Sequence, residues 1–225
     1  MIIYFKGTVF NAEADAIVNT VNCSGVMGAG LALEFSLRYP NMFEDYRAKC
    51  QREEIKVGRV SYYREKEKVI INFPTKWHFK YPSKIEWIRS ALNDFVHTYK
   101  AQGIQSVAFP KLGTLNGGLE WGQVRAVMEQ YLRQVDIPVY ICLDEDPACG
   151  LEKQMLEIFN DLSIEKLKRI VRLTEGQKKA LSEGKPFSRF WQIKQVEGIG
   201  ITTYQKIFLY CKDMAEGGEE QLTLF

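Results

Sequence analysis

A buried-strand pattern runs directly into a glycine-rich loop and a helix between Asp15 and Phe35, and this order constrains the fold more than any other part of the chain. Gly25, Gly28 and Gly30 allow the backbone to approach a ligand closely and to adopt positive φ. The helix that starts near Gly30 directs unpaired N–H groups and the positive end of its dipole at this loop. The stretch therefore predicts a site for a phosphate or a diphosphate.

The spacing of these glycines excludes two common nucleotide motifs. It matches neither G-x-x-x-x-G-K-[ST] nor G-x-G-x-x-G, and no acidic residue stands where the second motif needs a partner for the ribose. A different kind of diphosphate binder is therefore expected.

Short runs rich in β-branched and aromatic residues alternate with helical patterns over residues 1–147. Strands are predicted at 2–5, 16–21, 60–63, 69–73, 106–109 and 139–143. Helices are predicted at 83–102, with a capping box at Ser83 and Glu86, and at 121–133. This alternation favours an α/β domain in which a mixed, largely parallel sheet lies between helices and ligand loops follow the carboxyl ends of the strands.

Residues 148–212 differ, because their patterns are helical throughout, and we expect a small all-α domain. Helices are predicted over Leu151–Leu173, after a capping box at Thr174 and Gln177, and from Pro186. Within 187–210 a glycine-containing turn joins two amphipathic patterns, and each of these is expected to be a helix.

Charge is unevenly distributed in the last part of the chain. From Glu152 to Lys212 there are 12 basic and 7 acidic residues, a balance that suits binding to a polyanion. Residues 213–225 hold four acids and no base, and we expect them to form a flexible tail.

The five cysteines and two histidines limit the choice of cofactor and compartment. The cysteines are odd in number, scattered and never spaced C-x-x-C, so neither a disulfide framework nor a zinc site is indicated. We expect no metal, no cofactor and a cytoplasmic location. No apolar run reaches the roughly 20 residues of a membrane span, so no membrane partner is expected.

Three motifs together resemble the macrodomain superfamily. Asp15-Ala-Ile-Val-Asn19, Asn22 and Gly25-Val-Met-Gly-Ala-Gly30, preceded by Lys6-Gly7, resemble its first ADP-ribose-binding loop, and Pro110-Lys-Leu-Gly-Thr-Leu-Asn-Gly-Gly-Leu-Glu-Trp121 resembles its second. Ile71-Asn-Phe-Pro-Thr-Lys-Trp-His78 is similar to the branch that reverses ADP-ribosylation with a lysine, most closely to the bacterial DNA ADP-ribosyl glycohydrolase antitoxins (DarG type). The resemblance covers about residues 1–145 and implies a three-layer macrodomain.

The resemblance also implies roles for individual residues. Lys76 is expected to be catalytic, either attacking the ring-opened sugar as an amine or protonating the leaving base as an ammonium; the alternative is a solvated surface lysine. Asn22 is expected to hydrogen-bond the distal ribose, with the capping of a turn as its alternative. The remaining ADP-ribose contacts are expected from Thr8, Val26, Met27, Gly28, Ala29, Gly30, Leu31, Thr75, Leu112, Gly113, Thr114, Leu115, Asn116 and Gly117.

The chain departs from the wider superfamily at two positions. Thr8 stands where many macrodomains have an aspartate that binds adenine, and threonine offers a hydroxyl group in its place. Asn116 and Gly117 stand where the protein-directed relatives carry an aspartate, whereas the DNA-directed relatives resemble this chain. The expected substrate is therefore ADP-ribosylated DNA, with ADP-ribose as the product.

Three segments are expected to bring the enzyme to its targets. Trp77 and His78 are expected either to stack on the modified base or on flanking nucleotides, or to pack within the protein. The turn at Gly198 and Gly200 resembles a helix-hairpin-helix motif, which grips a DNA phosphate, with Lys194 and Lys206 adding affinity; the alternative is that these helices pack on the first domain. Gln221–Phe225 is similar to the peptide by which DNA-replication and repair proteins dock on the sliding clamp.

The expected function is the removal of ADP-ribose from DNA bases, as an antitoxin or a repair factor, with a cognate ADP-ribosyltransferase toxin as a possible partner. Two alternatives stay open. One is a hydrolase of ADP-ribosyl esters, either on protein carboxylates or in O-acyl-ADP-ribose. The other is a non-catalytic module that only binds ADP-ribose.

Overall fold

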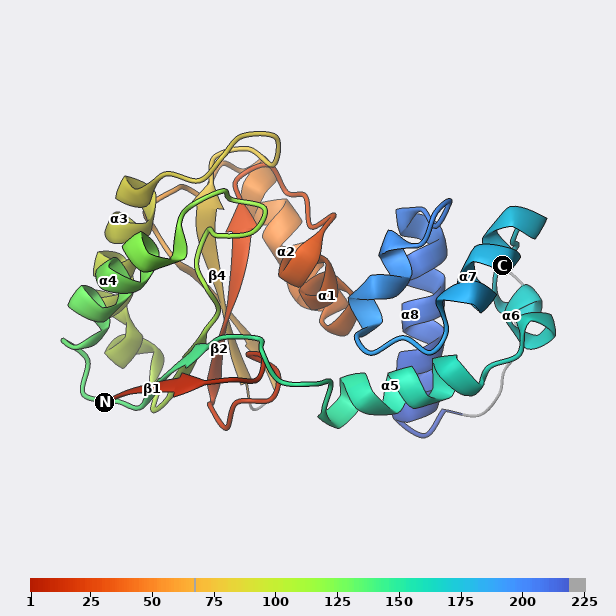
Figure 1. The fold of residues 1–225 in the computed structure, drawn as a ribbon. Coiled ribbons are helices and arrows are strands. Elements are labelled where there is room, and N and C mark those ends of the chain that lie inside the picture. Colours follow the sequence, from red (N-terminus) through yellow and green to blue (C-terminus); the bar gives the residue numbers. More distant parts are fainter. Residues whose placement is uncertain (67, 219–225) are drawn as a thin grey trace. The chain divides into compact units, whose positions relative to one another are not determined.

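The computed structural model describes residues 1–66 and 68–218 and divides the chain into two compact units (Figure 1). The first unit is Met1–Asp146, and the second begins at Pro147. The clamp-like segment Gln221–Phe225 lies outside the described residues.

The first unit contains one sheet of six strands in the order β1-β6-β5-β2-β4-β3. All neighbouring strands are parallel except β3 and β4, which form an antiparallel pair at one edge. This arrangement confirms the predicted mixed, largely parallel sheet. The strands are β1 (Ile2–Phe5), β2 (Ala16–Asn22), β3 (Ser61–Glu65), β4 (Lys68–Lys76), β5 (Val107–Phe109) and β6 (Val139–Cys142).

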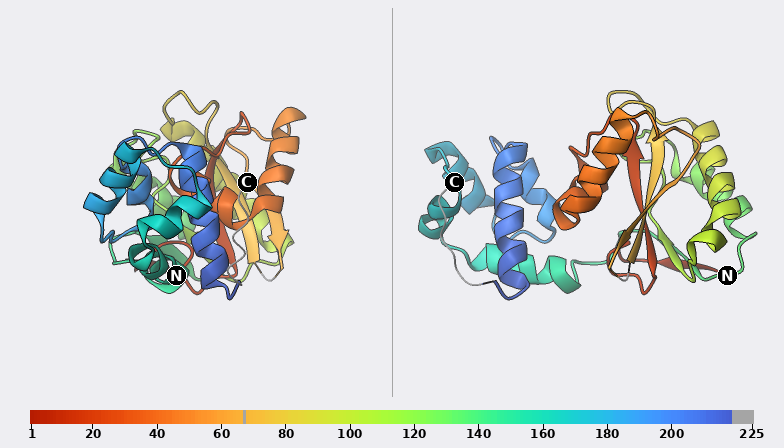
Figure 2. Two further views of the ribbon diagram at one scale, coloured as in Figure 1. Left: turned by 90° about the vertical axis from the view of Figure 1, so that its right-hand side faces the viewer. Right: turned by 180° about the vertical axis from the view of Figure 1, so that it is seen from behind.

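Helices cover both faces of this sheet (Figures 1 and 2). One face carries α1 (Gly30–Arg38) and α2 (Pro40–Gln51), and the other carries α3 (Ile85–Thr98) and α4 (Trp121–Leu132). A short 3-10 helix, η1 (Tyr99–Gln102), extends α3 and ends at Gly103, whose φ of 69° is the left-handed conformation of a helix end. Residues on both faces of the strands are buried, so the sheet lies between two apolar layers.

Aromatic packing fixes the layer between the sheet and α3. Phe73 and Phe109 come from β4 and β5, and Phe95 comes from α3; all three are fully buried. Phe109 makes edge-to-face contacts with both others, at ring-centroid distances of 6.3 and 5.2 Å. Burying a phenylalanine completely contributes about 1.5–3 kcal/mol, so this group anchors α3 beside the two strands that lead to the predicted loops.

The capping box predicted at Ser83 and Glu86 is wrong. Lys84 is the residue before α3, and no side chain caps this helix. The Ser83 backbone N–H donates instead to the carbonyl oxygen of Gly117, at 2.9 Å. Ser83 is therefore committed to the loop after β5, and the helix begins two residues later than the sequence pattern indicates.

The second unit is helical in its described residues. It contains α5 (Gly150–Asp161), α6 (Ile164–Ile170), α7 (Glu175–Gly184), the 3-10 helix η2 (Phe190–Gln195) and α8 (Ile201–Ala215). Its core is aromatic: Phe190 from η2 lies 6.2, 6.0 and 5.3 Å from the rings of Phe159, Tyr204 and Phe208.

Of the next three predictions for the second unit, two need correction and one is confirmed. The helix predicted over Leu151–Leu173 is divided at Leu162, because the Ser163 hydroxyl caps a new helix by accepting from Lys166 N–H at 3.2 Å. The capping box at Thr174 and Gln177 is confirmed. The acidic tail predicted from residue 213 begins later, since α8 continues to Ala215.

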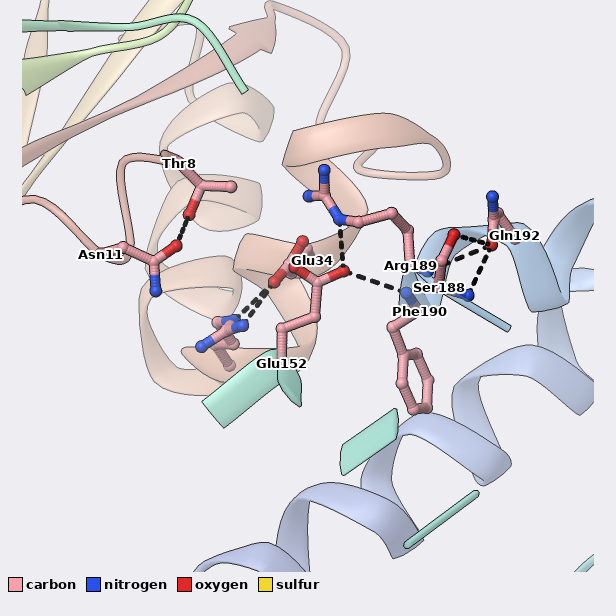
Figure 3. Close-up of polar contacts among 9 residues, drawn as sticks. Thr8, Asn11, Glu34, Glu152, Ser188, Arg189, Phe190 and Gln192 are labelled. Carbon is pink, nitrogen blue, oxygen red and sulfur yellow. Dashed lines mark hydrogen bonds and ion pairs between the residues drawn. The ribbon is translucent and has the colours of Figure 1, made fainter. Parts of the chain in front are cut away.

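The helix predicted from Pro186 is also wrong, because the chain after it is tied to α5. The amide of Asn160 exchanges two hydrogen bonds with the backbone of Phe187, at 2.9 and 3.0 Å. The Glu152 carboxylate then accepts from Arg189 Nε at 2.9 Å and from Phe190 N–H at 3.0 Å (Figure 3). These contacts hold the chain extended until η2, so the pattern predicted to be an amphipathic helix is a single short 3-10 segment.

No helix in the described parts of the chain is both long enough and apolar enough to cross a membrane.

Candidate active site at the carboxyl ends of β2 and β4

Lys76 is the last residue of β4, and it lies opposite Asn22, the last residue of β2. The pairing register is regular up to Val21 and Pro74 and then shifts, so that Thr75 is an extra residue in β4. Such a bulge turns the following side chain in a new direction. Lys76 and Asn22 are thus neighbours on adjacent strands, at the carboxyl ends of the parallel strands, where ligand loops are found.

The Lys76 side chain contacts the second predicted loop. Its Nζ donates a hydrogen bond to the carbonyl oxygen of Asn116. Partial burial lowers the pKa of the Lys76 ammonium below its ordinary value. Desolvation favours the neutral amine, which is the form needed for nucleophilic attack, although the ammonium remains the form needed for proton donation. This contact directs the Lys76 side chain at the second loop, and its catalytic role stays a prediction.

The first loop (residues 23–29, between β2 and α1) is organised by Asn22. Its side chain is buried, and its Oδ1 accepts from the backbone N–H and the hydroxyl of Ser24, at 2.9 and 2.7 Å. Its Nδ2 donates to the carbonyl oxygen of Val26 at 2.6 Å. Asn22 therefore caps the turn, as the alternative interpretation predicted, and its contact with ribose stays a prediction.

Tyr46, which belongs to none of the sequence motifs, supports the same loop through a hydrogen bond from α2. It is a fully buried residue of α2, and its hydroxyl donates to the Asn22 carbonyl oxygen at 2.7 Å. Burial raises the pKa of Tyr46 well above its ordinary value, so the hydroxyl keeps its proton and acts as a donor. No sequence signal distinguishes this tyrosine from the other ten.

The N-terminus of α1 has the features of an anion site. The preceding residue, Ala29, provides no side-chain cap, and the first turn of the helix contains no acidic residue. Gly30 has a φ of 55°, and a Cβ atom there would lie only 2.9 Å from the Asn116 side-chain nitrogen. The first backbone N–H groups of α1 are thus available to a negatively charged group, and the second loop lies directly beside them.

The second loop (residues 110–120, between β5 and α4) is held mainly by its own backbone. Leu119 N–H donates to the carbonyl oxygen of Gly113 at 3.1 Å, and the Thr114 hydroxyl donates to the carbonyl oxygen of Lys111 at 3.1 Å. Ser83 joins the loop through its N–H bond to Gly117, and its buried hydroxyl has no partner among the described residues. Glu120 then caps α4 by accepting from two backbone N–H groups.

The predicted ligand contacts separate into two groups. Met27 and Leu112 are buried in the two apolar layers, and Thr75 is also buried, with its hydroxyl directed at the carbonyl oxygen of Val21 at 3.4 Å. These side chains support the loops, and the backbone positions Gly113 and Gly117 are buried as well. The residues that are partly or fully exposed are Val26, Gly28, Ala29, Gly30, Leu31, Thr114, Leu115 and Asn116.

Thr8 follows β1 and contacts a residue of its own turn. Its hydroxyl donates to the Asn11 side-chain oxygen at 2.6 Å (Figure 3). The hydroxyl proton is therefore used within the protein, which leaves the oxygen as an acceptor. Trp77, by contrast, is 61% exposed, and His78 is partly buried among aromatic neighbours.

The residues predicted to bind DNA in the second unit surround the turn before α8. Gly198 has a φ of 78°, and its carbonyl oxygen accepts from Gln177 Nε2 at 2.7 Å, so this side of the turn packs on α7. Gly200 precedes α8 without a side-chain cap, and no atom lies within 4 Å of the position of a Cβ there. Lys194 and Lys206 lie in η2 and α8 and are partly buried.

A separate depression of about 480 Å³ lies over α3, and it contains none of the predicted site residues. It is an open depression whose lining includes arginine, histidine and aspartate side chains. The geometry of Lys76 and the two loops therefore places the candidate active site at the strand ends instead. The residues lining the depression are Gly58, Arg59, Arg89, Ser90, Asn93, Asp94, His97 and Tyr131.

Comparison with known proteins gives the family to which the fold belongs. The family model described as "Macro domain" matches residues 18–128. The solved structure "Macrodomain of Thermus aquaticus DarG" is 34% identical with a TM-score of 0.61, and the match covers 64% of this chain and 98% of that chain. The chain belongs to the macro domain family. Its macrodomain is the first unit, in which the sheet and all the residues of the candidate active site lie.

Other relatives of this macrodomain are longer proteins. A Mycobacterium tuberculosis protein named "DNA ADP-ribosyl glycohydrolase" is 43% identical over 147 residues, which are 62% of this chain and 42% of that protein. The solved structure "Thermosipho africanus DarTG in complex with ADP-ribose" is 33% identical with a TM-score of 0.61, over 63% of this chain and 41% of that one. The chain thus spans about two fifths of the length of the curated relatives it matches.

Proposed function

We propose that this protein is a hydrolase that removes ADP-ribose from DNA bases by cleaving the N-glycosidic bond at the distal ribose. The observation that carries the proposal is the position of Lys76. Its amine lies at the end of β4, opposite Asn22, and contacts Asn116 in the second loop, which lies beside the uncapped N-terminus of α1. A diphosphate bound at that N-terminus places a sugar near the lysine.

The two loops supply the groups that such a ligand needs. Backbone N–H groups of residues 28–30 and 113–115 would bind the diphosphate, because phosphates favour clustered amides and the positive end of a helix dipole. Thr8 would accept a hydrogen bond from the adenine. Water supplies the hydroxyl group that the anomeric carbon gains, and the base nitrogen gains a proton.

Asn116 favours DNA over protein as the carrier of ADP-ribose. Its carbonyl oxygen contacts Lys76 and its amide lies beside Gly30, so an aspartate here would bring a carboxylate close to both the lysine and the diphosphate. A neutral amide leaves the lowered pKa of Lys76 undisturbed. The M. tuberculosis relative, whose name states a DNA-directed activity, supports this choice of substrate.

The second unit would hold the DNA near the macrodomain. The open N-terminus of α8 at Gly200 suits a phosphate, and Lys194 and Lys206 lie on the adjoining elements. Replacing both lysines by glutamine is expected to weaken DNA binding and to flatten its dependence on salt. An unchanged salt dependence would assign the turn to packing.

In the cell we propose a role as an antitoxin or a DNA repair factor in the cytoplasm. The T. africanus protein, named as a fusion of a DNA ADP-ribosyl transferase and a DNA ADP-ribosyl glycohydrolase, supports a pairing with a transferase. Docking of Gln221–Phe225 on a sliding clamp stays part of the proposal.

The deciding experiment measures the release of ADP-ribose from three conjugates: ADP-ribosylated single-stranded DNA, ADP-ribosylated protein carboxylates and O-acyl-ADP-ribose. The wild-type protein is expected to act fastest on DNA, and Lys76→Ala is expected to lower that rate by about 100-fold or more. Lys100→Ala is the matched control, because this lysine is exposed and pairs with Asp136 near η1. Faster release from either ester, or equal rates in wild type and Lys76→Ala, would overturn the proposal.

A further inference from the structure

Four aromatic residues follow Lys76 directly and form an exposed cluster, which we call the aromatic platform: Trp77, His78, Phe79 and Tyr81. Trp77, Phe79 and Tyr81 are 61%, 44% and 55% exposed. Aromatic side chains normally supply apolar area to a core, so three of them exposed within five residues indicate a binding surface.

The rings of the platform are already arranged in stacks. Trp77 and Tyr81 are nearly parallel, at a centroid distance of 6.2 Å and an interplanar angle of 14°. His78 and Phe79 are stacked at 4.4 Å. Two hydrogen bonds to His78 hold this turn: Tyr81 N–H donates to its carbonyl oxygen at 3.1 Å, and Lys80 N–H donates to its side-chain Nδ1 at 3.2 Å. The flat faces are therefore ordered before any partner binds.

Lysine residues alternate with these rings along the chain, and no acidic residue lies among them. The segment 76–84 contains Lys76, Lys80 and Lys84 and lacks aspartate and glutamate. Lys80 Nζ lies 5.8 Å from the centroid of the Phe79 ring, and Lys84 Nζ lies 5.1 Å from that of Trp87. Flat aromatic faces interleaved with positive charge are complementary to unpaired bases on a phosphate backbone.

The platform is also joined to both loops of the active site. The Trp77 carbonyl oxygen accepts from Cys23 N–H of the first loop at 3.2 Å, and Ser83 N–H donates to the Gly117 carbonyl oxygen of the second loop at 2.9 Å. A strand that places one nucleotide beside Lys76 must leave the site between or across these loops. Residues 77–83, which include the platform, are bonded to both of these loops.

We infer that the aromatic platform binds the unpaired nucleotides that flank the modified base. The inference rests on the proposed function and adds the surface that reads the strand. Each flanking base stacks on an exposed ring, and Lys80 and Lys84 neutralise the phosphates between them. A duplex binds poorly, because its bases are already stacked on each other.

The first test separates the platform from the chemistry by comparing two substrates: an ADP-ribosylated single-stranded oligonucleotide and the ADP-ribosylated mononucleoside prepared from it. The double variant Phe79→Leu, Tyr81→Leu keeps apolar side chains but removes two rings. We expect its KM for the oligonucleotide to rise about tenfold, with kcat and the mononucleoside kinetics unchanged. Tyr4→Leu, which removes a 44% exposed ring from β1, is the matched control.

The second test does not depend on catalysis. Unmodified oligo-dT should quench the fluorescence of Trp77 when a base stacks on it, whereas Trp77→Leu should lose this quenching and the other three tryptophans should not report binding. A duplex of the same length should compete at least tenfold more weakly. Replacing Lys80 and Lys84 by glutamine should weaken binding of oligo-dT most at low salt.

The outcomes distinguish the two proposals. If the wild type hydrolyses neither conjugate, the proposed function fails, while quenching of Trp77 by oligo-dT would still support the platform. If the wild type hydrolyses the oligonucleotide and the double variant keeps its KM, the platform inference is overturned. The inference would also be overturned if the double variant lost binding to the cognate transferase but bound oligo-dT as well as the wild type does. That result would assign the surface to a protein partner.

Discussion

The two loops that surround Lys76 are held in different ways. The first loop is fixed by side chains: Asn22 caps it, and the buried Tyr46 supports Asn22 from α2. The second loop is fixed by its own backbone and by Lys76, and it carries Leu115, which is 92% exposed. The difference indicates a division of labour. On the proposed function, the first loop would be a preformed binding surface for the diphosphate, and the second would be a cover whose position depends on Lys76.

The largest effect is expected from Gly117→Ala. A Cβ atom at this position would overlap the carbonyl oxygen of Gly113 and press on Ser83 Oγ, so the second loop must shift. Because Lys76 is bonded to the neighbouring Asn116, we expect kcat/KM to fall by about 100-fold, the cost of a misplacement near 1 Å. Steady-state turnover with a thermal unfolding curve measures the effect.

Gly118→Ala is the control for that substitution. Gly118 has a positive φ, unlike Gly117, and no atom lies within 4 Å of its Cβ position, so only backbone strain of about 1–2 kcal/mol is added. Equal losses of activity in the two variants would mean that the tight contact at Gly117 does not position the lysine.

The pH dependence of turnover is expected to follow Lys76. Its folded-state pKa is lowered by desolvation, so the neutral amine appears at a lower pH than for an ordinary lysine. If the amine is the nucleophile, the rate rises about tenfold per pH unit until that pKa is reached; if the ammonium is the acid, the rate falls above it.

Asn116→Asp sharpens the same measurement. A carboxylate near Lys76 favours the ammonium and raises its pKa, so the rising or falling limb should move to higher pH. A limb that stays in place would show that the side chain at position 116 does not influence the pKa of Lys76 during turnover.

A smaller effect is expected from Tyr46→Phe, which removes the support of the first loop. The lost hydrogen bond to Asn22 should lower the free energy of unfolding by about 1 kcal/mol and weaken ADP-ribose binding by about fivefold. Denaturant unfolding and calorimetric titration measure both quantities. Tyr63→Phe, in the edge strand β3, is the control, because its ring is not fully buried. Unchanged ADP-ribose affinity in Tyr46→Phe would contradict the idea that the hydrogen bond from Tyr46 preorganises the first loop for ligand binding.

The smallest effect is expected from Leu115→Ala. The side chain is almost fully exposed, so stability should change by less than about 0.5 kcal/mol, and a ligand contact through the backbone N–H would be preserved. Leu115→Pro removes that N–H and should weaken ADP-ribose binding clearly. Calorimetric titration of both variants with ADP-ribose decides whether Leu115 contacts the ligand through its backbone N–H.

Much of the first unit was predictable, because the signals are local. The period-two strands and the long apolar face of the helix after Ile85 follow from residue order, and all six strands were predicted. The capping box at Ser83 was wrong because a local pattern competed with a distant partner: Gly117 lies far along the chain and accepts the Ser83 N–H. The helix predicted from Pro186 was wrong for the same reason, because Asn160 and Glu152 of α5 bind the chain there. The break at Ser163 is different, because it rests on a local cap between Ser163 and Lys166 that the helical pattern did not indicate.

The candidate site shows the same division. The glycines were selected because their spacing after a buried strand suits a diphosphate, whereas Lys76 and Asn116 were selected from the resemblance to macrodomain motifs. Tyr46 and Ser83 were not found, because an ordinary tyrosine and serine gain their roles only through contacts across the fold.

By itself the sequence determined the order of strands, loops and helices, the chemistry of the two loops and the identity of the lysine, because these depend on residues close together in the chain. The tertiary structure alone decided that Lys76 faces Asn22 across a bulge, that its amine reaches the second loop, and that its pKa is lowered. Register, burial and long-range hydrogen bonds are properties of packed surfaces, and they come into being only when distant segments meet.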